Sequence, residues 1–121
     1  MKRLLLLAVL AGPAQAQDMA AAPGGMLRVL DKLSGMLVDL ELSRGEAQTN
    51  GRLTVQLDDC RYPVDDPASD AEAHLTIHVA PLVDPVFAGW MVASSPALSA
   101  LDHPRYDVWV LRCDTPAAVT P

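Results

Sequence analysis

The chain has 121 residues, enough for one small domain. Its 15 Asp and Glu residues outnumber its 9 Lys and Arg residues, and the formal net charge is -6. An acidic surface repels nucleic acids and anionic lipid headgroups, so the composition argues against both as partners.

The N-terminus has the three-part order of a secretory signal peptide. Lys2 and Arg3 supply the positive charge, residues 4–12 the apolar stretch, and Ala14-Gln15-Ala16 the cleavage site of small residues. The apolar stretch covers only about half of a ~30 Å hydrocarbon core, which is too short for a lasting membrane anchor. We therefore predict a cleaved signal peptide over residues 1–16, localisation to the periplasm, and no stable membrane insertion of the mature chain.

The mature chain divides into three parts. Residues 17–25 are predicted to be a flexible leader, residues 26–114 a β domain, and residues 115–121 a disordered tail. Residues 26–42 show both a helical spacing of apolar residues and strict alternation near their end, with Ser34-Gly35 in the middle. We favour a hairpin with strands at 27–31 and 37–42 joined by a tight turn.

Four further strands are predicted. Residues 53–57 and 74–79 alternate between apolar and polar, which is typical of half-buried strands. Residues 86–92 and 106–113 are richer in β-branched and aromatic residues, as central strands tend to be. Ser95 before Pro96 predicts an N-capped short helix that runs to Leu101. The pattern predicts an all-β domain, a small antiparallel β-sandwich or barrel of about six strands with one short helix.

Cys60 and Cys113 are the two cysteines of the chain. Cysteines of a small exported domain usually pair, and closing a loop of about 54 residues would stabilise the fold by roughly 4 kcal/mol. A thiol nucleophile or a metal pair is the alternative, but the C-x-x-C spacing is missing. By alternation Cys60 falls on the wet face. A bulge at Asp58-Asp59 would turn it inward and place the disulfide against Trp109.

Two stretches carry a resemblance. They are Gly51-Arg52-Leu53-Thr54-Val55 with Cys60-Arg61-Tyr62-Pro63, and Phe87-Ala88-Gly89-Trp90-Met91 through Ser94-Ser95-Pro96-Ala97-Leu98 to His103-Pro104-Arg105-Tyr106-Asp107-Val108-Trp109. Together they resemble the domain-of-unknown-function 2155 family of exported Gram-negative proteins, although Asn50 stands where that family prefers an apolar or aromatic residue. The resemblance covers nearly all of the mature domain. It implies export and a pair between the two cysteines, and it implies no activity and no catalytic residue.

Two groups of side chains were considered as metal ligands. His74 and His78 share a strand face, but four residues along a strand separate their Cα atoms by about 13 Å, too far for one ion. Six acids crowd one region and could hold calcium, although the spacing of a calcium loop is absent; they are Asp58, Asp59, Asp65, Asp66, Asp70 and Glu72. We expect solvated histidines, a solvated acidic loop, no metal and no cofactor.

Residues suited to hydrolysis occur in one segment, but without a catalytic motif. The segment contains Ser94, Ser95, Ser99, Asp102 and His103, whereas the Gly-x-Ser-x-Gly motif is missing. Ser95 is better explained as a helix cap, and Asp102-His103-Pro104 as a turn. We therefore expect a protein that is not an enzyme.

Residues 86–101 contain no charged side chain although the chain is acidic. We predict that this segment forms an apolar interaction patch of Trp90, Met91, Leu98 and Leu101; the alternative is a strand covered on both faces.

The expected function is a non-catalytic exported accessory protein that docks on a membrane or periplasmic complex, respiratory or otherwise, through an unknown protein partner. A small-ligand or glycan-binding module is the second reading, because the chain has two Trp and two Tyr, although a small core should need both tryptophans. A hydrolase is a distant third.

Overall fold

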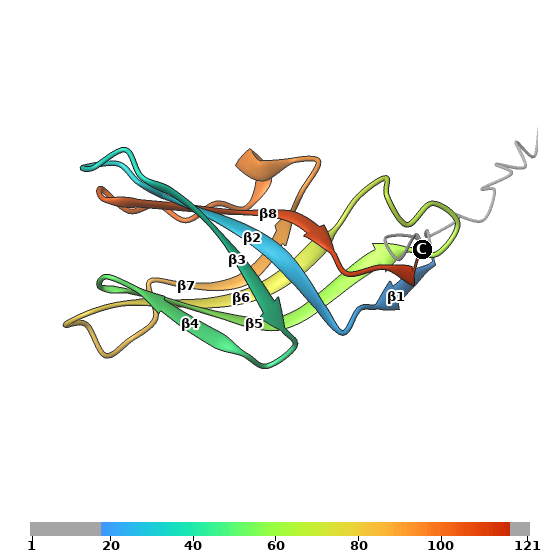
Figure 1. Ribbon diagram of the computed structural model, residues 1–121, viewed down its shortest axis with the longest axis horizontal. Helices are drawn as coiled ribbons and strands as arrows, with labels where there is room; N and C mark the ends of the chain where they lie inside the picture. The colour runs from blue at the N-terminus through green and yellow to red at the C-terminus, as the bar shows by residue number, and fades with distance from the viewer. Residues whose placement is uncertain (1–17, 117–121) are drawn as a thin grey trace, which may run out of the picture.

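The computed structural model describes residues 18–116 (Figure 1). The predicted signal peptide lies outside the described residues, as does the tail from residue 117 onward. Two antiparallel sheets pack face to face as a sandwich, which confirms the predicted all-β class. No helix in the described part of the chain is long and apolar enough to cross a bilayer.

The first sheet is built around its longest strand. It contains β1 (Met19–Ala21), β4 (Ala47–Asn50), β5 (Leu53–Pro63), β6 (Glu72–Val79) and β7 (Phe87–Val92). The 11 residues of β5 pair with β6 on one side. On the other side β5 pairs with β4 near its start and with β1 near its end. The order β1-β5-β6-β7 leaves β7 at one edge of the sheet.

The second sheet has three strands in the order β3-β2-β8. They are β2 (Gly24–Asp31), β3 (Leu37–Ser43) and β8 (Tyr106–Cys113). The predicted hairpin is confirmed, since β2 and β3 pair from Leu30 opposite Leu37 to Gly24 opposite Ser43. The turn between them contains Gly35 with φ 76°, a conformation that glycine adopts at little cost.

Aliphatic side chains from both sheets fill the space between them. Alternation along each strand turns one face inward, as in β6, where every second residue is buried. The largest fully buried side chains include Leu27, Leu40, Leu42, Leu53, Leu57, Leu75 and Ile77. Neither tryptophan belongs to this core or to the partly buried hydrophobics packed against it. The expectation that a core of this size needs both tryptophans is wrong, because seven leucine and isoleucine side chains already fill it.

The flexible leader expected before residue 26 is wrong for its described part. Residues 19–21 form β1 against the end of β5, and Ala22 is buried. Gly24 and Gly25 begin β2, and both are buried as well. A Cβ on Gly25 would lie 2.9 Å from Cys60 Sγ and 2.9 Å from the Arg112 carbonyl oxygen. Gly25 is therefore required by the close approach of β2 to the disulfide, and Gly24 by its close contacts with Leu42 and Asp114.

Two details of the predicted second half also differ. β7 and β8 lie at sheet edges, not at sheet centres, since each pairs with one neighbouring strand. The predicted helix is a single 3-10 turn at Pro96–Leu98, and the Ser95 side chain makes no capping hydrogen bond. Instead the Ser95 N–H donates to the Val92 carbonyl, so the residue closes a turn after β7.

Each cysteine follows one extra residue in its strand. In β5 the pairing shifts between Leu57 and Asp59, which confirms the predicted bulge and turns Cys60 inward. In β8 the pairing shifts at Leu111, so that Cys113 faces inward with Val110, not outward with Trp109. Cys60 and Cys113 form a disulfide with Cα atoms 5.7 Å apart, which confirms the pairing. The predicted contact between the disulfide and Trp109 is wrong because of the second bulge.

Candidate interaction face

Trp90 stands on the outer face of the five-stranded sheet among charged side chains. Alternation along β6 turns Glu72 and His74 outward, and the β6–β7 register places Trp90 directly beside His74. Downstream of the bulge in β5, Arg61 lies opposite Glu72 and also faces outward. We call Asp58, Arg61, Glu72, His74 and Trp90 the Trp90 cluster.

Arg61 and His74 both contact the indole of Trp90. The guanidinium carbon of Arg61 lies 4.0 Å from the Trp90 ring centroid, within the range of a cation–π interaction. The His74 ring meets Trp90 edge to face, with centroids 5.2 Å apart and an interplanar angle of 85°. Arg61 Nη2 is also 3.7 Å from Glu72 Oε2, a weak ion pair at the surface. The ring is therefore held in place while remaining partly exposed.

The bulge in β5 also positions Asp58 on this face. Asp58 Oδ2 lies 2.7 Å from His74 Nδ1 and accepts a hydrogen bond of 2.7 Å from Thr76 Oγ1. Its other oxygen accepts a hydrogen bond of 3.0 Å from Gln56 Nε2. These bonds fix the His74 ring that in turn packs against Trp90, so the cluster is ordered by side chains from three neighbouring strands.

The two histidines share the outer face as predicted, but they are not equivalent. His74 is bonded to Asp58, whereas His78 lies at the far end of β6, opposite Thr54. Within residues 18–116 no three His, Cys, Asp or Glu side chains gather in a way that could hold a metal ion.

Four of the six acids of the predicted acidic loop contact protein groups. Asp58 and Glu72 belong to the Trp90 cluster. Asp59 Oδ1 accepts from the Cys60 N–H and lies 3.6 Å from Arg44 Nε. Asp70 binds Ser94 through both carboxylate oxygens. Asp65 and Asp66 are the exposed members. The acids therefore do not form one solvated group.

The four residues of the predicted interaction patch do not share a surface. Met91 and Leu101 are 3% and 5% exposed and belong to the core. Leu98 is 77% exposed on the 3-10 turn, and Trp90 lies on the outer sheet face. The predicted patch is wrong because side chains of the uncharged segment point in different directions. Met91 in β7 and Leu101 at the end of the following loop point into the core, whereas Trp90 and Leu98 do not.

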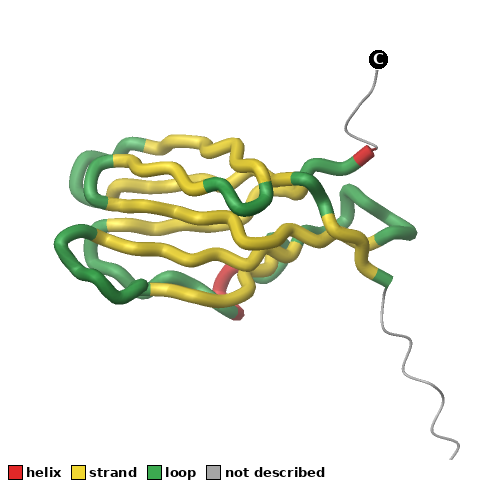
Figure 2. The backbone as a smooth tube through the Cα atoms, turned by 90° about the horizontal axis from the view of Figure 1, so that it is seen from below, coloured by secondary structure: helices red, strands yellow, loops and turns green. Residues whose placement is uncertain are grey.

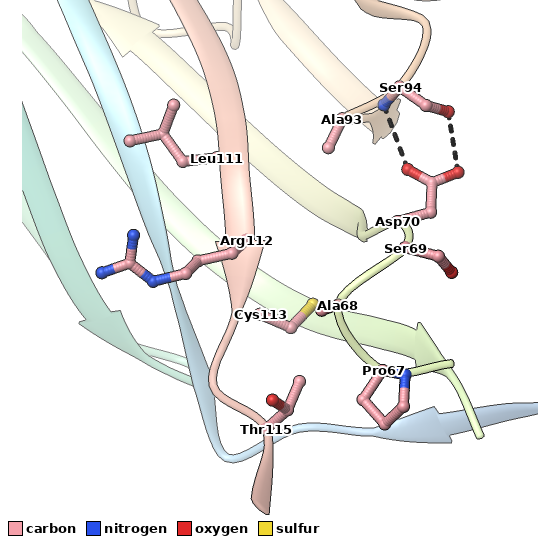
Figure 3. Close-up of a pocket in the computed structure, with 10 residues that line it drawn as sticks. All are labelled: Pro67, Ala68, Ser69, Asp70, Ala93, Ser94, Leu111, Arg112, Cys113 and Thr115. Atoms are coloured by element: carbon pink, nitrogen blue, oxygen red, sulfur yellow. Dashed lines mark hydrogen bonds between the residues drawn. The ribbon is translucent and has the colours of Figure 1, made fainter. Parts of the chain in front are cut away.

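Ser94 and His103, the two ends of the segment with residues suited to hydrolysis, are separated by the length of β8. Ser94 lies beside a pocket of about 370 Å³ next to Cys113, where its N–H and hydroxyl both donate to Asp70 (Figure 3). Arg112 extends away from Asp70 in the same view. His103 lies at the other end, where its Nδ1 accepts from the Arg105 and Tyr106 N–H groups. About 20 Å of strand separates them, so the structure does not bring Ser94 and His103 together.

Two ion pairs lower the pKa of the aspartate that each contains. A hydrogen bond from the Arg28 side chain lowers the pKa of Asp39 below its ordinary value, with Arg28 Nε 2.7 Å from Asp39 Oδ1. A hydrogen bond from Arg105 likewise lowers the pKa of Asp31, with Arg105 Nη2 3.1 Å from Asp31 Oδ2. Arg28 and Asp39 lie on neighbouring strands of the second sheet, and Asp31 and Arg105 lie at its end.

Sequence reasoning missed the Trp90 cluster. Its members come from three strands, and their contacts depend on the register between β5, β6 and β7, which no local pattern reveals. One signal was present: a bulge that turns Cys60 inward also turns Arg61 outward.

Comparison with known proteins places the chain in a family. The profile of a family described as uncharacterized protein conserved in bacteria, domain of unknown function 2155, matches residues 25–113. An uncharacterized protein of Rickettsia prowazekii (strain Madrid E) is 30% identical over 92 residues, which are 74% of this chain and 59% of that relative. The chain thus spans about three fifths of the length of this relative, and no solved structure matches. The protein belongs to the domain-of-unknown-function 2155 family, and the sandwich with its disulfide is the structure of the matched region.

Proposed function

We propose that the protein is a non-catalytic accessory protein of the periplasm that docks on a membrane-bound or periplasmic complex through the Trp90 cluster. One observation carries the proposal: Trp90 is held on the outer face of a sheet by contacts with Arg61 and His74, although the interior is aliphatic. A partly exposed tryptophan that is already ordered loses little conformational entropy when a partner covers it.

The composition of the Trp90 cluster fits a protein contact. Tryptophan and arginine are the residues most enriched among those that carry binding energy at protein interfaces. Asp58 and Glu72 flank them and supply charges that could fix the orientation of a partner. The flat outer face of a sheet offers a broad contact surface without a deep cavity.

Arg61 also favours a protein over a glycan as the ligand. Sugars bind by stacking on an open aromatic face, whereas one face of the Trp90 ring is covered by the guanidinium at 4.0 Å. A glycan on that side would have to displace Arg61. The glycan-binding alternative therefore predicts a different response to mutation of Arg61.

The periplasmic address rests on the predicted signal peptide and on the disulfide. Disulfides persist in oxidising compartments, of which the periplasm is one. A respiratory or cell-envelope complex suits this address.

The proposal is tested by cross-linking in intact cells and affinity purification from solubilised envelopes. Trp90→Ala should reduce the recovered partner at least tenfold, which corresponds to about 1.4 kcal/mol. Trp109→Ala is the matched control, because Trp109 is also half-buried but belongs to the other sheet. Both variants should keep their melting temperature within a few degrees.

Three outcomes would contradict the proposal. Equal partner recovery by the Trp90→Ala variant would show that the cluster is not the contact. Selective loss in the Trp109→Ala variant would move the contact to the second sheet. Copurification of a saccharide that binds more tightly after Arg61→Ala would favour glycan binding.

A further inference from the structure

Exposed aliphatic side chains gather at the ends of two hairpins. Seven large hydrophobic residues are exposed in residues 18–116, and five of them lie in or beside the β2–β3 and β6–β7 turns. These five are Leu33, Met36, Leu37, Leu82 and Val83. Val83 is 89% exposed and Leu33 is 76% exposed, so the two side chains at the tips have almost no contact with the domain.

Both hairpins point to the same end of the sandwich. The Lys32 N–H donates to the Arg105 carbonyl, and the Ala80 N–H donates to the Arg52 carbonyl. The Tyr106 hydroxyl accepts from the Arg52 N–H at 3.4 Å, which ties the second sheet to the β4–β5 turn. We call the turns at residues 31–37, 50–52, 80–86 and 102–105 the hairpin end. It lies opposite β1 in both views of the backbone (Figures 1 and 2).

The charge of the domain is distributed unevenly between its ends. The hairpin end contains three acids and three bases, so it has no net charge; they are Asp31, Asp84, Asp102, Lys32, Arg52 and Arg105. The whole negative excess of the described residues lies outside it. Five aspartates fall within residues 58–70, toward the opposite end. An anionic surface would therefore repel the disulfide side of the domain and turn the hairpin end toward itself.

We propose that the hairpin end docks on the surface of a lipid bilayer, with Leu33, Met36, Leu82 and Val83 as anchors. The proposal goes beyond the proposed function and shares only its envelope address. Isolated aliphatic side chains on separate protruding turns suit a fluid interface, since each can enter the acyl boundary independently. A protein interface would favour a contiguous surface with aromatic residues. Lys32 and Arg52 lie beside the tips and would meet the headgroups of anionic lipids.

The test is flotation with vesicles of phosphatidylethanolamine and phosphatidylglycerol. It uses processed protein recovered from an expressing Gram-negative host and shown by mass to begin at Gln17. The double variant Leu33→Ser with Val83→Ser should bind about tenfold more weakly, because each substitution removes an apolar side chain from the interface. The double variant Val64→Ser with Leu98→Ser is the matched control, since these residues are the exposed hydrophobics outside the hairpin end among residues 18–116. The control should bind like the parent.

Further variants separate the bilayer from a protein partner. Arg52→Gln should weaken binding to these anionic vesicles and leave binding to phosphatidylcholine vesicles unchanged. Trp90→Ala should leave vesicle binding unchanged, which distinguishes failure here from failure of the proposed partner contact. A parent protein that does not float would overturn the proposal, as would equal loss in the control pair. Loss of a protein partner by the hairpin-end variants, with vesicle binding retained, would assign the hairpin end to a protein interface.

Discussion

The two sheets are held together differently at the two ends of the sandwich. At one end the disulfide joins the sheets, Gly25 allows their close approach, and five aspartates fall within residues 58–70. At the hairpin end no disulfide joins the sheets among residues 18–116, and the buried ring of Tyr106 links them through its contact with Arg52. The comparison teaches that a covalent crosslink and a buried aromatic side chain can close opposite ends of one small sandwich. The end without a crosslink is electrically neutral.

The largest expected effect comes from removing the crosslink. The double variant Cys60→Ser with Cys113→Ser loses the constraint on the unfolded chain, about 4 kcal/mol, or roughly 16 °C of melting temperature or more. Thermal unfolding followed by circular dichroism measures it. The parent in reducing buffer should approach the variant, and the variant should not respond to reductant. A drop of less than about 5 °C would mean that contacts other than the disulfide hold the acidic end together.

An intermediate effect is expected from Gly25→Ala. The new methyl would meet Cys60 Sγ and the Arg112 carbonyl oxygen at 2.9 Å, and neither atom can move without shifting a strand. We expect a loss of about 2 kcal/mol in the free energy of unfolding. Gly89→Ala is the control, because its Cβ would meet only Phe87 at 3.6 Å, an ordinary contact. Chemical denaturation of the two variants compares them, and equal stabilities would contradict a steric role for Gly25.

The smallest effect concerns the hairpin end. The pKa of Asp31 is lowered in the folded state by its hydrogen bond from Arg105. The pair therefore stabilises the fold above the unfolded pKa of about 4, and this contribution is lost as the pH falls through the lower folded value. Asp31→Asn should remove part of the decline in melting temperature below pH about 4 and lower it slightly at pH 7. Asp84→Asn is the control, because it removes a charge at the same end. Below pH about 4, the melting temperature of this control should fall more steeply than that of the Asp31→Asn variant. Identical profiles would contradict the role of the pair.

Sequence reasoning recovered the parts of the fold that follow from local alternation. The β2–β3 hairpin, β6, the first bulge and the disulfide were all predicted from spacing and context. The second bulge was missed because apolar residues occur on both faces of β8: Tyr106, Val108 and Val110 point inward, whereas Trp109 lies on the other face. β1 and β4 were missed because small and polar residues form strands there only by pairing with β5. The Trp90 cluster depends on register across three strands and could not be predicted locally.

The two bulges determine whether the cysteines of this sequence can form the crosslink. Leu57 and Cys60 both point inward although three positions separate them, and so do Val110 and Cys113. In each strand the separation between core residue and cysteine is odd, so regular alternation would turn the sulfur outward, and the bulge returns it to the inner face. A variant that pairs without the bulge but keeps its full length would turn the sulfur toward water, whereas deletion of Asp58 or Leu111 would leave an even separation and keep the sulfur inward. Strand length and strand pairing must therefore match for the crosslink to form.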